Sequence, residues 1–257
     1  MDRRQFAVGV LAAAAFPTLA AAAPPPPTRD DLALANRILA HEGVVDGFGH
    51  VSVRDPANPG RYWLARSMAP ALVTPGDILT YDLQSTPLDA NGAQSYLERF
   101  IHGAIYAARP DVQSVVHAHT PAVIPFGVSR VPLRAVFHMG AFLGAGGVPI
   151  FEIRDTAGSA TNLLVSTNEL GAALARTLGS ANVALMRGHG MVTVGTTIPE
   201  AVFRAYYTGA DAQLESDALR LGPVNFLTAD EAKAATQTQS ALVSRSWELW
   251  KVAASRS

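Results

Sequence analysis

A helix that turns directly into a strand is the strongest constraint that this sequence places on its fold. The stretch from Tyr96 to Thr120 reads YLERFIHGAIYAARPDVQSVVHAHT. Its apolar residues recur at helical spacing as far as Pro110, and the run VQSVVHAH has the length and β-branched content of a strand. Because proline cannot continue a helix, the short turn at Asp111 folds the helix back on the strand. The polar residues of the two elements are therefore expected to lie close together.

The rest of the chain carries helix and strand signals in an order that does not alternate strictly. Apolar residues at helical spacing follow a Thr-Asp capping signal, and short β runs are bounded by glycine and proline. These signals predict helices over residues 28–45 and 198–222, and strands over 49–55, 61–65 and 183–195. This order is typical of an α/β domain with a partly antiparallel sheet. With no repeat or linker, we expect one domain over residues 29–257.

The N-terminal segment differs from the rest. Arg3 and Arg4 precede an uncharged, alanine-rich run that Pro17 interrupts, and four prolines follow. The arginine pair followed by Gln-Phe resembles the twin-arginine type of bacterial signal. We therefore expect an export signal over residues 1–23, a proline-rich spacer over 24–28, and a periplasmic protein without stable membrane insertion. The alternative is an uncleaved anchor, because the apolar run is about long enough to span a bilayer.

Composition excludes several classes of partner and site. The formal charge is −1 and the chain has no block of Lys or Arg, so neither a nucleic acid nor an anionic membrane is expected as a partner. There is no cysteine, which excludes disulfides, thiolate metal ligands and a cysteine nucleophile. Any metal ion must therefore be held by histidine and carboxylate.

The spacing of the polar residues predicts a metal site. His117 and His119 are two apart, so on a strand their imidazoles lie side by side and can chelate one ion. Glu98 lies on the preceding helix, on one face with His102 four residues later. His189 lies between two glycines, which let the backbone turn tightly and direct its ring. Together, three imidazoles and a carboxylate would form a four-ligand divalent site.

Each of these residues also has a structural interpretation that spacing alone does not remove. His117 and His119 can be a hydrogen-bonded pair on a strand. Glu98 can lie on the solvated face of an amphipathic helix, and His189 can be a loop residue in a tight hairpin. The residues alone leave both interpretations open.

The run E-R-F-I-H-x-x-I-Y-x-x-R-P-D-x-x-x-V-V-H-x-H, followed later in the chain by Gly-His-Gly, resembles the class II aldolase/adducin family. The resemblance implies a single three-layer α/β/α domain with a mixed, largely antiparallel central sheet. It also implies a homotetramer with active sites between subunits. By this resemblance His117, His119 and His189 are metal ligands, and Glu98 alternates between metal ligand and proton carrier.

Two positions depart from the sugar-phosphate aldolases of that family. The phosphate-binding asparagine is replaced by His50, and the serine pair before the acid is replaced by Tyr96 and Leu97. A phosphorylated sugar is therefore a poor fit. Segments such as YLERFIHG, FHMGAFLGAG and LMRGHG are instead similar to the branch that decarboxylates hydroxylated aromatic or heteroaromatic acids.

We therefore expect a divalent-metal-dependent carbon–carbon lyase that decarboxylates a small hydroxylated aromatic or heteroaromatic acid through an enolate or phenolate. One Zn²⁺ or Mn²⁺ per subunit is expected. Glu98 would return the proton to carbon, and Arg66, Ser67 and His50 would bind the substrate carboxylate. His138 would line the pocket. The alternatives are a surface salt bridge for Arg66 and a core position for His138.

Three other functions remain open. The first is an aldolase acting on an unphosphorylated hydroxy-carbonyl substrate, since aldol cleavage also leaves an electron pair that must delocalise onto an oxygen. The second is a non-catalytic, adducin-like association module. The third is a periplasmic metal-binding protein without turnover.

Overall fold

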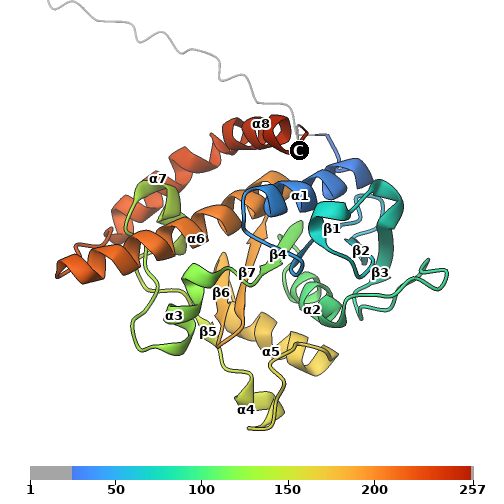
Figure 1. The fold of residues 1–257 in the computed structure, drawn as a ribbon, viewed down its shortest axis with the longest axis horizontal. Helices are drawn as coiled ribbons and strands as arrows, with labels where there is room; N and C mark the ends of the chain where they lie inside the picture. The colour runs from blue at the N-terminus through green and yellow to red at the C-terminus, as the bar shows by residue number, and fades with distance from the viewer. Residues whose placement is uncertain (1–24, 256–257) are drawn as a thin grey trace, which may run out of the picture.

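The computed structural model describes residues 25–255, and the predicted export signal lies outside them. Its centre is a seven-stranded sheet in the order β3-β2-β1-β4-β7-β6-β5 (Figure 1). The pair β5–β6 is parallel and all other neighbouring pairs are antiparallel. The strands are β1 His50–Arg54, β2 Arg61–Ala65, β3 Ile78–Asp82, β4 Ser114–Ala118, β5 Ile150–Phe151, β6 Val183–Met186 and β7 Gly190–Gly195.

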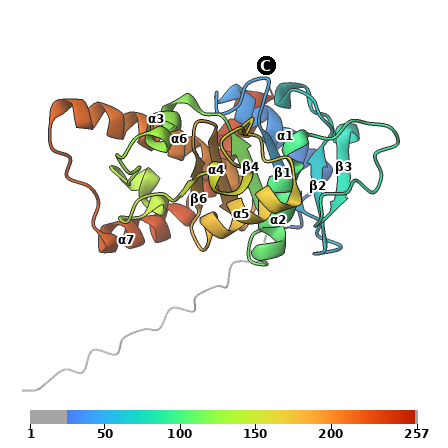
Figure 2. The ribbon, with the colours of Figure 1, turned by 90° about the horizontal axis from the view of Figure 1, so that it is seen from below.

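Helices cover both faces of this sheet. One face packs against α1 (Arg29–His41) and α6 (Ile198–Leu221), and α8 (Val243–Ala254) packs on the outer side of these two helices. The other packs against α2 (Phe100–Ala108) and α5 (Asn168–Leu178), which lie side by side in Figure 2. Each interface has its own apolar core, so the predicted three-layer α/β/α domain with a mixed, largely antiparallel sheet is confirmed.

The remaining elements connect these layers. They are α3 Ile124–Val128, α4 Arg154–Ala157, α7 Ala229–Ser240, and the 3-10 turns η1 Pro70–Leu72, η2 Pro75–Asp77, η3 Leu97–Arg99, η4 Pro121–Val123 and η5 His138–Leu143. Within residues 25–255, no helix is both long enough and apolar enough to cross a bilayer.

The helix-to-strand stretch folds largely as its sequence predicts, with one correction. The regular helix α2 begins only at Phe100, and Glu98 lies before it in η3 with a non-helical backbone (φ −94°, ψ 17°). Glu98 and His102 therefore do not lie on consecutive turns of one helix. Because η3 changes the direction of the chain, the Glu98 carboxylate approaches the end of β4 independently of α2.

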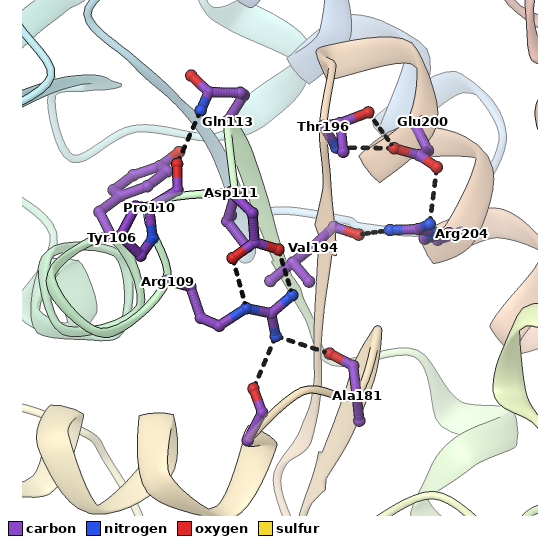
Figure 3. Close-up of polar contacts among 12 residues, drawn as sticks. Tyr106, Arg109, Pro110, Asp111, Gln113, Ala181, Val194, Thr196, Glu200 and Arg204 are labelled. Carbon is purple, nitrogen blue, oxygen red and sulfur yellow. Dashed lines mark hydrogen bonds and ion pairs between the residues drawn. The ribbon is translucent and has the colours of Figure 1, made fainter.

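Two arginines fix the turn between α2 and β4: Arg54 of β1, which donates to the carbonyl oxygens of Tyr106, Arg109 and Val112, and Arg109 of the turn itself. Arg109 makes a two-pronged ion pair with Asp111, at 2.8 and 2.7 Å, as Figure 3 shows. Its remaining nitrogen donates to the carbonyl oxygens of Gly179 and Ala181, in the turn between α5 and β6. Arg109 thus joins the α2–β4 turn to the α5–β6 turn at this end of the sheet.

Candidate metal centre

Four side chains converge at one end of the sheet. His117 is the fourth residue of β4, His119 follows that strand, His189 lies in the turn between β6 and β7, and Glu98 comes from η3. Their ligand atoms all lie within 4.8 Å of one another. The Nε2 atom of His119 is 3.0 Å from that of His117 and 2.9 Å from that of His189. The structure thus brings together all four predicted metal ligands.

The glycines beside His189 make this approach possible. Gly188 has φ +64°, a conformation that costs other residues energy. At Gly190, a Cβ atom would lie 2.2 Å from the carbonyl oxygen of Ala118. The β6–β7 turn can therefore lie directly against the end of β4, where the imidazole of His189 reaches those of His117 and His119.

Backbone carbonyls orient two of the rings. His117 donates from Nδ1 to Met191 O at 3.0 Å, and His189 donates from Nδ1 to Leu163 O at 2.8 Å. A neutral imidazole has one N–H, so both rings keep an unshared electron pair on Nε2, facing the centre. Such outer contacts are what fix ring orientation at metal sites.

Glu98 is buried, with 7% of its surface exposed, and its two oxygens have different partners. Oε1 accepts the Val165 N–H at 2.9 Å, and Oε2 lies 3.3 Å from Nε2 of both His117 and His189. Burial alone would raise the pKa of this carboxyl. The imidazoles of His117 and His189 that face Oε2 outweigh burial and hold the pKa of this carboxyl well below its usual range. Glu98 is therefore an anion with one oxygen directed at the three rings.

This donor set fits a divalent ion. Unshared pairs on Nε2 of His117, His119 and His189 face one another at close range, and a cation between them removes that repulsion. Burial and the neighbouring His117 and His189 lower the pKa of His119 to about 4, so its ring is neutral at ordinary pH. Imidazole nitrogens and one carboxylate are ligands that first-row divalent ions accept. The side chain of His119, 34% exposed, marks the open side of the centre.

A second histidine pair lies behind the centre. His50 packs against the ring of His117, with centroids 5.1 Å apart, and against Tyr96 at 4.6 Å. His102 is fully buried and hydrogen-bonds His50 at 2.7 Å. Burial and adjacent histidines lower the pKa of His50, and that of His102 to about 3, so both rings are neutral. The structure thus places the predicted substrate residue His50 beside the centre, whereas His102 is a supporting residue.

The other predicted substrate residues lie elsewhere in the single chain. Arg66 pairs with Asp77 at 2.7 Å, which is the surface salt bridge considered as its alternative. The Ser67 N–H donates to the Gln94 carbonyl. His138, in η5, lines a small pocket against α6 and α7, among Met139, Phe142 and Phe203. Within the described residues, none of the three has a hydrogen bond or ring contact with the four converging side chains.

Sequence reasoning missed the contribution of residues 163–165. The segment acts through main-chain atoms, the Leu163 carbonyl on His189 and the Val165 N–H on Glu98. The side chains of Leu and Val carry no signal for such a role. Only the positive φ of Leu163, +69°, distinguishes the segment, and it is visible in the structure alone.

Comparison with known proteins places this centre in a family. The model of the class II aldolase and adducin N-terminal domain matches residues 30–215. The chain belongs to the class II aldolase and adducin family. Among family members, decarboxylase tropJ of Talaromyces stipitatus is 36% identical over 83% of this chain and 88% of its own. The 3,4-dihydroxyphthalate decarboxylase of Arthrobacter keyseri is 32% identical, over 69% and 73%.

Solved structures of class II aldolases share the fold. The L-fuculose 1-phosphate aldolase of Glaciozyma antarctica superposes with a TM-score of 0.67 and 26% identity, covering 82% of this chain and 80% of its own. The sheet and its helical layers are thus those of a class II aldolase.

Proposed function

We propose that this protein is a divalent-metal-dependent decarboxylase of a small hydroxylated aromatic or heteroaromatic acid. Relatives named as decarboxylases and an aldolase are lyases, and the chain is an enzyme of that class. One observation carries the proposal: a buried, ionised Glu98 directs a free oxygen at three convergent imidazoles. An adducin-like association module has no need of such a carboxylate.

The chain's residues supply the proton transfers of this reaction. Glu98 is ionised and lies at the centre, so its carboxylate can accept the phenolic proton of the bound substrate. Glu98 gives this proton to the ring carbon that bears the carboxylate, and the ring oxygen takes the ketone form. Cleavage of the bond from that carbon to the carboxylate then releases CO₂, and its electron pair delocalises onto the ring oxygen. When bound, a divalent ion supplies the positive charge that stabilises this oxygen. Solvent then protonates the departing phenolate.

The surface beside the centre supports a flat apolar substrate. Phe48 is 69% exposed, and its ring centroid lies 6.3 Å from that of His119, on the open side. Leu97, next to Glu98, is 64% exposed. Aromatic rings stack at such separations. His50 and Tyr96 pack together at the positions where the sugar-phosphate aldolases bind phosphate, which supports a substrate without phosphate.

Several finer features belong to the same proposal. One Zn²⁺ or Mn²⁺ per subunit is supported by three imidazole ligands, the affinity order favouring zinc and the decarboxylase resemblance favouring manganese. The substrate carboxylate would contact His50, whereas Arg66, Ser67 and His138, the other residues expected to bind substrate, have no hydrogen bond or ring contact with the four converging side chains within one described subunit. A homotetramer with active sites between subunits would cover the exposed Phe48 and Leu97. The Arg3–Arg4 pair supports export to the periplasm.

The test is CO₂ release by protein loaded separately with Zn²⁺ and with Mn²⁺. The substrates are 2-hydroxybenzoate, 3,4-dihydroxyphthalate and hydroxypyridine carboxylates, and the control is chelator-treated protein. We expect metal-dependent CO₂ release with at least one acid. If every acid is inert while the protein holds its metal, the decarboxylase proposal is wrong.

The second candidate is an aldolase for an unphosphorylated hydroxy-carbonyl substrate. The fold shared with L-fuculose 1-phosphate aldolase favours it, because the same centre can stabilise an enolate. Aldehyde release from hydroxy-ketones and hydroxy-acids, measured on the same loaded protein, distinguishes the two reactions.

A further inference from the structure

A chain of four buried hydrogen-bonding groups ends at His50. The Tyr106 hydroxyl lies 2.7 Å from Ser52 Oγ, and Ser52 Oγ lies 2.6 Å from Nδ1 of His102. His102 Nε2 lies in turn 2.7 Å from Nδ1 of His50. The exposed fraction of these four residues is 1% at Tyr106, zero at Ser52 and His102, and 4% at His50. The contacts join α2 to β1 and lead to the ring beside His117.

The two hydroxyl groups determine which atom donates in each of these hydrogen bonds. Burial raises the pKa of Tyr106, so its hydroxyl keeps its proton, and Ser52 Oγ is its hydrogen-bonding side-chain partner. Tyr106 therefore donates to Ser52. The Ser52 hydroxyl in turn donates to Nδ1 of His102, its remaining partner.

The same order of donor and acceptor continues through both imidazoles. With Nδ1 accepting, neutral His102 carries its proton on Nε2 and donates it to Nδ1 of His50. Because Nδ1 of His50 accepts this hydrogen bond, the ring must carry its proton on Nε2, an atom with no hydrogen bond to any described residue. The opposite direction would leave one hydroxyl proton, of Tyr106 or Ser52, buried without an acceptor, at a cost of about 1–3 kcal/mol.

We propose that Ser52 and Tyr106 are positioning residues that keep His50 in the tautomer with N–H at Nε2, and that this N–H donates a hydrogen bond to the substrate carboxylate. The second half rests on the proposed hydroxyaromatic acid substrate. A neutral donor suits decarboxylation. The carboxylate loses its charge as CO₂ leaves, so a cationic partner would stabilise the ground state more than the transition state.

The tautomer can be read directly by NMR. In zinc-loaded protein with ¹⁵N-labelled histidine, the His50 Nε2 signal should be that of a protonated nitrogen and the Nδ1 signal that of an acceptor nitrogen. A signal assigned the other way round in the parent protein would overturn the proposal, and this measurement needs no variant to fold.

A matched pair of serine variants tests the role of the four hydrogen-bonded side chains. Ser52→Ala removes the hydroxyl that specifies the proton on His102, so both tautomers of His50 should become populated. Affinity for 2-hydroxybenzoate should fall by about threefold to tenfold, the value of one hydrogen bond. The control is Ser95→Ala, because Ser95 also accepts a hydrogen bond from a buried tyrosine, Tyr81, at 2.9 Å. It should change neither the tautomer nor the affinity.

Other outcomes separate this inference from the proposed function. If Ser52→Ala behaves as Ser95→Ala does, Ser52 and Tyr106 do not position His50 and the inference is wrong. If the tautomer and affinity results hold but no acid is decarboxylated, the proposed reaction fails and the binding role of His50 stands. CO₂ release by a parent protein with an unprotonated Nε2 on His50 would reject this inference alone.

Discussion

The carbonyl oxygen of Leu163 lies 2.8 Å from Nδ1 of His189, and this contact ties an irregular segment to the metal centre. Two residues later, the Val165 N–H holds Glu98 Oε1 at 2.9 Å. The segment between α4 and α5 therefore orients two of the four proposed ligands through main-chain atoms. Its geometry depends on the left-handed backbone of Leu163.

Two substitutions at Leu163 should have opposite effects on metal binding. Glycine adopts φ +69° without steric cost, so Leu163→Gly should keep the zinc affinity within a few-fold of the parent. Proline cannot adopt this angle, so Leu163→Pro should displace the carbonyl and lower the affinity by about 10- to 100-fold. Competition with a zinc-binding dye measures both values. Equal affinities would show that this carbonyl does not support the centre.

His117→Ala should lower the metal content per chain to a small fraction of the parent value. The ring places Nε2 among the other ligand atoms, and its Nδ1 is already bonded to Met191. Elemental analysis after dialysis gives the metal content, and circular dichroism checks that the fold is retained. His138→Ala is the matched control, because His138 lies in a different pocket. Stoichiometric metal in folded His117→Ala would remove this residue from the site.

Glu98→Gln should retain most of the metal and lose most of the activity. The amide keeps an oxygen to accept the Val165 N–H, and three imidazoles remain as ligands. It cannot carry the proton, and loss of a general acid or base typically lowers the rate by about 10²- to 10⁴-fold. Bound metal and turnover are measured side by side. Full activity refutes the proton-transfer role, whereas loss of both metal and activity makes Glu98 mainly a ligand.

Asp211 should make the protein less stable as the pH rises. Burial raises the pKa of this α6 carboxyl to about 7, against the opposing effect of hydrogen bonds from Val136 and Phe137. In the unfolded chain the pKa is about 3.9. Because the folded pKa is the higher one, the stabilising contribution is complete below about pH 4 and is lost between about pH 4 and 7.

Asp211→Asn removes this pH dependence. The free energy of unfolding of the variant, relative to that of the parent, should rise between about pH 4 and 7 by up to about 1.4 kcal/mol per pH unit, and then level off. Urea unfolding of metal-free protein across this range measures the difference, and chelation keeps the metal centre from contributing. A difference that does not change with pH would contradict the raised pKa.

Replacing Arg3 and Arg4 together by Lys should retain the precursor in the cytoplasm. The twin-arginine route recognises the guanidinium pair, so preserving the charge does not preserve export. Cell fractionation of the variant and the parent gives the result. Unchanged export would favour the general secretion route.

Local sequence signals predicted the elements whose ends are marked by caps and breakers. Thr28 caps α1 with Asp31, as the Thr-Asp signal indicates, and Gly222 ends α6. The short strand β5 has only two residues, too few for a periodic pattern. In the site, the ligand atoms could be predicted because the side chains of histidine and glutamate are known metal ligands and can be recognised in the sequence. The main-chain groups of Leu163 and Val165 could not, since any residue carries them.

The sheet order sets when the centre can be completed during synthesis. β4 lies between β1 and β7, so residues 98–119 and their partner β1 are made well before residues 189–195. Until β7 emerges, one edge of β4 has no partner and offers its hydrogen-bonding groups to other chains. The last imidazole arrives together with the strand that closes this edge. Capture of a metal ion by the four proposed ligands would thus coincide with protection of the nascent chain from aggregation.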